Sequence, residues 1–271
     1  MIALFQTYPF LLDAVIAGLV VALVTGAFSV IVLLQRLAFM GVGIGHAAFG
    51  GVAIGWVAGI SPLGSAMLFA MGVATAIHWA ATRGRLPDDS VIGIFFSAAM
   101  AFGVLLVGLY PAPTPDLMGF LFGDLLAVTH ADLELLVPAG VGLLILAGVL
   151  FESWTIMSFH EDLARTAGLA TGRLKLLALL GLAMATVLAI KMVGVVLASA
   201  LLIAPAATAR RWSHRPFVLL LSSLGVAVTG TLGGIALAWR FDWPVGATIV
   251  LVLTTLFLAS LAFKGSAIAA R

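Results

Sequence analysis

One uncharged run of the sequence combines six glycines with a single histidine. Met40–Gly55 reads MGVGIGHAAFGGVAIG, and His46 is its only ionisable side chain. An imidazole at this position could bind a transition-metal ion or carry a proton. It could equally stay neutral and donate one hydrogen bond to a neighbouring carbonyl. The Gly-x-Gly-x-Gly spacing suits a phosphate loop only where a strand precedes it and a soluble helix follows, so the elements around the run decide its chemistry.

A second group of reactive side chains lies near the middle of the chain. The segment YPAPTPD (Tyr110–Asp116) is rich in proline, and Asp124, His130, Asp132 and Glu134 follow it. Carboxylate and imidazole groups gathered in this way could contact a passing cation. We therefore take Asp124 and His130 as candidate metal ligands at the outer rim of a pathway.

The longest polar stretch, Glu152–Lys175, reads ESWTIMSFHEDLARTAGLATGRLK. Ser158 followed by acids at 161 and 162 is typical of a helix N-terminus, and Gly168 is a typical helix stop. The segment 158–169 is therefore predicted to hold a short helix of about two turns. From these residues alone, an ordinary loop helix without a function is the simpler interpretation.

The composition indicates which solvent surrounds these groups. Of the 271 residues, 63% are hydrophobic and 9% charged, and the mean hydropathy is +1.25, whereas soluble domains carry about 25% charged residues. This predicts an all-α, polytopic membrane protein with the lipid bilayer as its main solvent. The net charge of +2 is scattered and does not support nucleic-acid binding. Because cysteine is absent, disulfides and thiolate metal sites are excluded.

Nine segments are apolar enough to cross a bilayer, which takes about 20 residues each. We expect eight or nine spans, because Lys191 and Gly194 interrupt a run that could be one broken helix. The segment 117–129 is too short to span and is predicted to be re-entrant or interfacial. The predicted spans are 12–34, 38–60, 63–82, 91–110, 133–152, 174–190, 192–209, 217–238 and 245–263.

The basic residues are divided unevenly between the two sides of these spans. If the loop at Arg36 is cytoplasmic, eleven Lys and Arg residues fall inside and only Lys191 and Arg240 fall outside. This asymmetry follows the positive-inside rule. It predicts a cytoplasmic C-terminus, and we interpret residues 1–271 as a single transmembrane domain.

Because the glycine-rich run falls in a predicted span, its glycines are expected to serve helix packing and not phosphate binding. Gly41 and Gly45 are four residues apart, and so are Gly51 and Gly55. Small residues at this spacing let two helices approach closely. His46 then lies on a helix inside the bundle, where an ionisable side chain is by default a functional hypothesis.

Several classes of activity find no support in the sequence. It contains no Walker A motif, no His-Glu-x-x-His and no plausibly spaced Ser/His/Asp set, so an enzyme is not expected. ATP-driven transport would therefore need a separate ATPase subunit. The predicted spans hold essentially no acid away from their ends, which argues against proton-coupled transport.

Five stretches in one order along the chain resemble a known family. The most specific is KMVGVVLASALLIAPAATARRW (Lys191–Trp212). The others are LLQRLAFMGVGIGHAAFGGVAIG (Leu33–Gly55), DDSVIGIFFSAAMAFGVLL (Asp88–Leu106), LMGFLFGDLLAVT (Leu117–Thr129) and SFHEDLARTAGL (Ser158–Leu169). Together they resemble the zinc/manganese ABC-transporter permeases, the membrane subunits of bacterial metal importers, over about residues 12–263.

The resemblance implies a homodimer in the bacterial inner membrane, with the pore on its two-fold axis. Two copies of a cytoplasmic ATP-binding subunit would bind the coupling segment 158–169. A periplasmic metal-binding protein would deliver the metal ion to the outer loops between residues 116 and 132. The resemblance assigns coupling to Phe159, Glu161, Asp162, Ala164 and Gly168.

The chain departs from the family's pattern in the early helix. The family usually has Asp four residues before the histidine, where this chain has Val42, and often Pro four residues after it, where this chain has Gly50. Losing that carboxylate disfavours manganese and favours zinc, which suits imidazole ligands. We therefore expect a zinc permease with His46 as a transient ligand and no cofactor of its own. Copies of His46 from two subunits could meet at the two-fold axis.

Other functions stay open at this point. The cargo could be manganese, a metal chelate or haem, because an apolar interior would suit a bulky cargo as well. The chain could also be a secondary transporter or channel that works alone, or a membrane scaffold. Binding of an ATPase through the segment 158–169 would distinguish an ABC permease, whatever its cargo, from a protein that works alone.

Overall fold

The computed structural model describes residues 9–84, 87–110, 123, 125 and 128–262, and these residues form nine α-helices and no strand. Eight of the nine are long and apolar enough to cross a membrane, which confirms the prediction of an all-α, polytopic protein. The helices are α2 (Pro9–Gln35), α3 (Ala38–Ala58), α4 (Pro62–Gly84), α5 (Asp88–Leu109), α7 (His130–Phe159), α8 (Glu161–Thr166), α9 (Thr171–Ala209), α10 (Pro216–Phe241) and α11 (Val245–Ala262).

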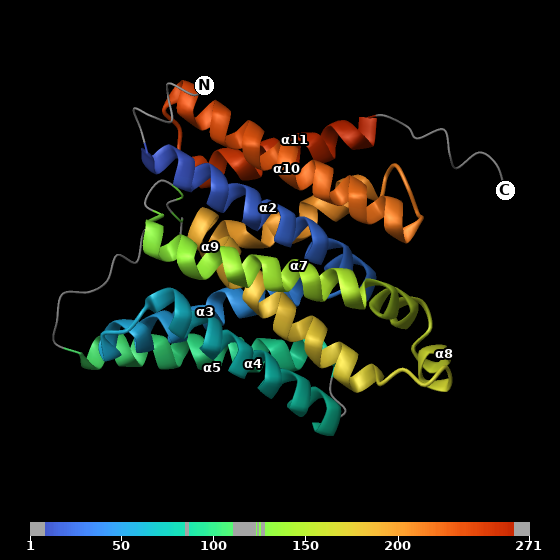
Figure 1. The fold of residues 1–271 in the computed structure, drawn as a ribbon. Coiled ribbons are helices and arrows are strands. Elements are labelled where there is room, and N and C mark those ends of the chain that lie inside the picture. Colours follow the sequence, from blue (N-terminus) through green and yellow to red (C-terminus); the bar gives the residue numbers. More distant parts are fainter. Residues whose placement is uncertain (1–8, 85–86, 111–122, 124, 126–127, 263–271) are drawn as a thin grey trace.

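The bundle consists of two groups of helices with α9 between them (Figure 1). In one group α3 packs against α4 and α5; in the other α2 packs against α7 and α10, and α10 against α11. α9 contacts members of both groups. α2, α3 and α9 are the most buried of the eight spans, whereas α5 and α11 leave most of their surface free for lipid.

α9 reverses direction within the bundle. Its φ/ψ values are helical except at Gly194, where φ is 78° and ψ is 169°. This backbone region is open essentially to glycine alone. The predicted spans 174–190 and 192–209 are thus two arms of one helix broken at Gly194. A straight helix of 39 residues would measure about 58 Å, twice the ~30 Å hydrocarbon core of a bilayer.

Side-chain contacts show that both ends of α9 lie at the same side of the bundle. Lys175 in its first turns and Arg210 at its C-terminal end line one pocket. Lys191, near the break, instead forms an ion pair with Asp132 at the start of α7. We call the side with the ends of α9 the basic face and the side with Asp132 the opposite face.

The basic residues gather on the basic face, as the sequence predicted. Lys191 and Arg240 lie at the opposite face, and Arg85, Lys264 and Arg271 are outside the described residues. The described residues at helix ends or connections of the basic face are Arg36, Arg83, Arg165, Arg173, Lys175, Arg210, Arg211 and Arg215.

The coupling segment differs from its prediction in where the short helix begins. Ser158 belongs to α7, and its hydroxyl donates to the carbonyl of Trp154 at 2.6 Å. The residue that precedes α8 is His160, which forms no side-chain cap. The predicted Ser158 cap is therefore wrong, because α7 continues to Phe159, and α8 has only six residues.

The glycines of α3 face two different neighbours. A Cβ added at Gly45 would lie 3.7 Å from side chains of α9, and one at Gly41 would lie 3.5 Å from Leu202, both ordinary contacts. A Cβ at Gly51 would instead lie 2.6 Å from the Cα of Ala66, and one at Gly55 would lie 2.9 Å from the Cα of Pro62 in α4. The backbones of α3 and α4 thus touch at Gly51 and Gly55.

Candidate functional site

His46 lies in the third turn of α3 and is half-buried. Its Nδ1 is 2.9 Å from the carbonyl oxygen of Val42. Since a carbonyl only accepts, Nδ1 donates its proton there, and Nε2 is left with a lone pair that can bind a metal ion. Phe96 of α5 meets the imidazole edge-on, with 5.6 Å between the ring centroids. These two contacts hold the ring in one orientation.

The surroundings of His46 are apolar. Its neighbours along α3, including Ile44 and Ala47, are buried hydrophobic residues, and α3 contains no acid. Across the described part of the chain, no three His, Asp or Glu residues come together in a way that could hold a metal ion. His46 therefore belongs to no such group of ligands within the described residues.

The opposite face carries a compact polar cluster at the start of α7. Asp132 accepts hydrogen bonds from the backbone N–H of Thr129 at 3.0 Å and from its hydroxyl at 2.9 Å, while Thr129 caps α7. The Nζ of Lys191 lies 3.0 Å from the same carboxylate. One carboxylate oxygen of Asp132 is thus shared by a helix cap and an ion pair that ties α7 to the middle of α9.

The two candidate rim ligands are not brought together by the described residues. His130 is 80% exposed, and its Nδ1 is 3.8 Å from a carboxylate oxygen of Asp13. Asp124 lies outside the described residues, as does most of the segment 117–129. From that segment Gly123 packs against the backbone at Val193, next to the break in α9.

The coupling segment ends in a tight helix stop. α8 ends at Thr166, and Gly168 has a φ of 82°. The N–H of Gly168 donates to Arg165, and that of Leu169 donates to Ala164, both at 3.0 Å, which is the Schellman pattern that favours glycine at this position. Ala164 is fully buried.

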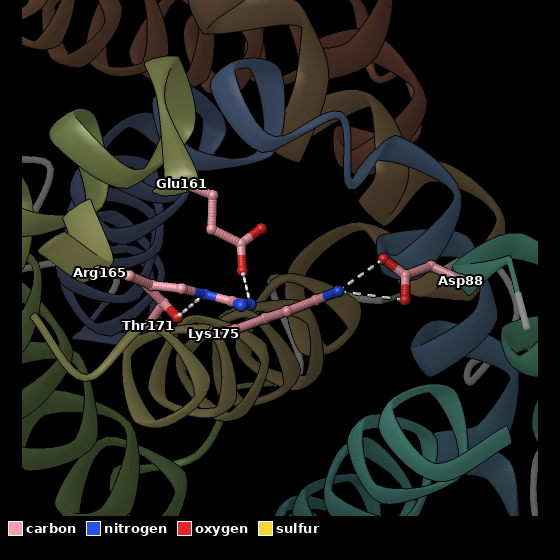
Figure 2. A network of polar contacts seen from close by, with 5 residues as sticks. All are labelled: Asp88, Glu161, Arg165, Thr171 and Lys175. Atoms are coloured by element: carbon pink, nitrogen blue, oxygen red, sulfur yellow. Dashed lines mark hydrogen bonds and ion pairs between the residues drawn. The ribbon is translucent and has the colours of Figure 1, made fainter. Parts of the chain in front are cut away.

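Arg165 connects α8 to the start of α9 (Figure 2). Its guanidinium donates to Glu161 at 2.6 Å and to the hydroxyl of Thr171 at 3.1 Å. The outward side of the segment is exposed: Phe159 is 54% and Leu163 61% exposed. The segment therefore has an exposed surface that carries apolar side chains, while Arg165 fixes it to α9.

Further contacts fix the first arm of α9 on the same face. Lys175 forms two hydrogen bonds with the carboxylate of Asp88 at the start of α5, at 2.8 and 3.2 Å (Figure 2). The indole N–H of Trp154, which is buried in α7, donates to the carbonyl of Leu174 at 2.9 Å. The arm that follows the coupling segment is thus bound to both groups of helices.

Comparison with known proteins connects these features to one family. The model of the ABC 3 transport family matches residues 7–264. The chain belongs to the ABC 3 transport family. This confirms the resemblance noted in the sequence and makes the chain a permease subunit of the ABC class.

Relatives named as metal-transport membrane proteins match nearly the whole chain. It is 32% identical to the manganese transport system membrane protein MntC of Halalkalibacterium halodurans, over 95% of this chain and 88% of the relative. It is 29% identical to the high-affinity zinc uptake system membrane protein ZnuB of Haemophilus influenzae, over 94% and 97%. A solved structure of PsaBC from Streptococcus pneumoniae in complex with Fab matches 98% of this chain and 97% of that chain, with a TM-score of 0.85 and 31% identity.

Several polar contacts of this ABC 3 family member were not predicted from the sequence. Asp88, Lys175 and Trp154 hold the first arm of α9 to the bundle, and Lys191 pairs with Asp132. The partners Lys175 and Asp88 are 87 residues apart, so no local spacing links them. In the sequence, the charged residues of these pairs stand out only because each lies at the end of a long apolar run.

Proposed function

We propose that this chain is the membrane subunit of an ATP-driven importer of divalent metal ions, with zinc preferred to manganese. The observation that carries the proposal is His46, whose Nε2 is left free in an apolar helix that has no carboxylate. Zinc accepts imidazole ligands readily, whereas manganese prefers oxygen ligands. Relatives named as manganese and as zinc permeases both support a metal ion as the cargo.

A single weak ligand suits transport. An ion held by many protein ligands would be released slowly, while one imidazole lets it pass. In the proposed homodimer, His46 of two copies would meet near the two-fold axis and offer two nitrogens. The ion would come from a periplasmic metal-binding protein, pass the outer rim near His130, and leave on the basic face, which we assign to the cytoplasm because of its Lys and Arg residues.

The energy of ATP hydrolysis would reach the permease through the coupling segment. A cytoplasmic ATP-binding subunit would contact the exposed side chains of Phe159, Glu161 and Asp162. Buried Ala164 and the Schellman stop at Gly168 would keep α8 rigid. Since Arg165 links α8 to Thr171, a movement of the ATPase would reach α9 directly. The bacterial inner membrane and a cytoplasmic C-terminus belong to the same proposal.

Metal uptake in zinc-starved cells with and without the chain, using zinc and manganese isotopes in parallel, tests the cargo. We expect zinc uptake to depend on the chain and His46→Ala to lower it at least fivefold. His214→Ala, which removes a loop histidine of the basic face, is the matched control and should leave uptake unchanged. Uptake of manganese alone would overturn the metal preference, and uptake of neither would favour a chelate or haem.

Co-purification tests the coupling assignment. Glu161→Lys combined with Asp162→Lys should abolish retention of the ATP-binding subunit without unfolding the permease, because Asp162 is exposed and the ion pair of Glu161 with Arg165 is itself more than half exposed. Glu134→Lys makes the same charge change at the opposite face and should retain the subunit. Transport that proceeds without any ATPase would instead indicate a secondary transporter or channel.

A further inference from the structure

A pocket of about 610 Å³ opens on the basic face beside the coupling segment. Its walls come from the end of α2, the start of α5, the end of α7, the start of α8 and both ends of α9. Phe159 and Glu161 of the coupling segment form part of the wall. We call it the Arg36/Arg210 pocket, after the two arginines that line it.

The acids of this pocket are already neutralised. Asp88 is held by Lys175 at 2.8 Å, and Glu161 by Arg165 at 2.6 Å (Figure 2). Both carboxylates therefore have a cationic partner within the chain, and neither is left to balance another charge.

Several hydrogen-bond donors line the pocket without a side-chain acceptor among the described residues. Neither Arg36 nor Arg210 has a side-chain hydrogen bond or ion pair to any described residue. The side-chain amide nitrogen of Gln35, which is buried, also lacks an acceptor in the described part of the chain. A buried donor without an acceptor costs about 1–3 kcal/mol. Two guanidinium groups and one amide nitrogen thus line the pocket without a side-chain acceptor among the described residues.

We infer that the Arg36/Arg210 pocket receives a carboxylate side chain of the ATP-binding subunit. A carboxylate accepts hydrogen bonds only, and a guanidinium binds it through two parallel bonds. Arg36 follows α2 and Arg210 follows α9, two of the three most buried spans, so the pocket lies among the inner helix ends and not at the lipid-facing edge. Part of the pocket wall belongs to the coupling segment, to which the ATPase would bind. This favours a protein carboxylate over a lipid phosphate.

This inference rests on the proposed function and adds a second point of attachment to it. α8 is joined to the start of α9 through Arg165, whereas Arg210 stands at the end of α9. A carboxylate bound between Arg36 and Arg210 would couple the ATPase to the second arm of α9 and to α2. The ATPase would then act on both arms of the reversed helix.

The test uses the full permease in nanodiscs and the ATP-binding subunit that co-purifies with the wild-type chain. Failure of any ATPase to co-purify with the wild type would refute the proposed function itself. The variants are Arg210→Gln and Arg36→Asn; asparagine is chosen because Arg36 has a φ of 58°, which asparagine tolerates. Arg211→Gln is the matched control, since it removes the neighbouring charge outside the pocket.

We expect Arg210→Gln and Arg36→Asn each to weaken ATPase binding by about tenfold, the loss of one charged hydrogen-bonded contact. Arg210→Lys should keep more affinity than Arg210→Gln, and Arg211→Gln should change the Kd less than twofold. Thermal unfolding of the variants should match the wild type, because neither arginine has a partner among the described residues.

Two results would overturn the inference while leaving the proposed function intact. Equal effects of Arg210→Gln and Arg211→Gln would show only a general attraction between charged surfaces. Phosphatidylglycerol retained by the wild type but lost from Arg210→Gln, with unchanged ATPase affinity, would show that a lipid phosphate fills the pocket.

Discussion

Replacing Gly194 by alanine tests whether the reversal of α9 depends on a backbone conformation that only glycine adopts easily. At φ 78° and ψ 169°, a residue with a Cβ is strained by about 1–3 kcal/mol. Gly194→Ala should therefore destabilise the native bundle by about 1–3 kcal/mol. The greater helix preference of alanine, about 1 kcal/mol, in addition favours a straight α9 as the competing conformation.

The measurement is thermal unfolding of the purified chain in detergent. For a chain of this length 1 kcal/mol corresponds to about 2 °C, so the Tm should fall by about 2–6 °C. Gly172→Ala is the matched control on the same helix. Nothing lies within 4 Å of a Cβ added there, and its φ is not positive, so the control should leave the Tm unchanged or raise it slightly.

Metal uptake is a second assay for the Gly194→Ala variant. Gly194→Ala should also lower uptake, because a straighter α9 would separate Lys175 from Arg210, which now line one pocket. A Tm of Gly194→Ala equal to that of Gly172→Ala would refute the reasoning. It would mean that the packing of the two arms, and not the freedom of Gly194, determines the reversal.

Two further predictions concern the contacts of α3 and α9. Gly51→Ala should lower the Tm, since its Cβ would lie 2.6 Å from the Cα of Ala66 and overpacking costs about 1–3 kcal/mol, whereas Gly72→Ala, with open space around it, should not. Lys191→Met should destabilise by about 1–3 kcal/mol by leaving the carboxylate of Asp132 without its cation. Adding Asp132→Asn should recover part of that loss in a double-mutant cycle, and strictly additive effects would contradict the ion pair.

The spans could be predicted from sequence because lipid demands long apolar runs with every backbone group paired inside the helix. The predicted 38–60 and 245–263 differ from α3 and α11 by only a residue or two at their ends. α7 was predicted too short, as 133–152, because polar residues after position 151 suggested a loop. In the structure these polar groups are satisfied within the bundle, since Thr155 and Ser158 donate to carbonyls one turn earlier and Trp154 donates to Leu174, so the helix continues.

The break in α9 was only half-predictable. Both Lys191 and Gly194 interrupt the apolar run, and sequence alone does not say which one bends the backbone. In the structure Lys191 remains helical and its long side chain reaches Asp132, so its charge is satisfied without a break. Gly194 alone leaves the helical region. The deciding contact joins residues 59 positions apart, which no local pattern contains.

The candidate site was predictable where its chemistry is local and not where it is tertiary. His46 could be found because it is a lone imidazole in an apolar run, and its bond to Val42 is one helical turn away. Ser158 was misread as a cap because its spacing to Glu161 matches a capping pattern that α7 overrides. The two unpaired arginines became visible only when helix ends distant in sequence met at one pocket.

The ion pairs of α9 show how its first arm could transmit force between the two groups of helices. At one end Lys175 binds Asp88 of α5, and at the other Lys191 binds Asp132 of α7. On the basic face the arm is therefore fixed to both groups, since Trp154 of α7 also donates to the carbonyl of Leu174, and α8 joins it there through Arg165. On the opposite face it is fixed to α7 alone. Under the proposed function, a push on α8 would then move the first arm of α9 together with α7, and the Lys175–Asp88 ion pair is the contact through which that movement would reach α5.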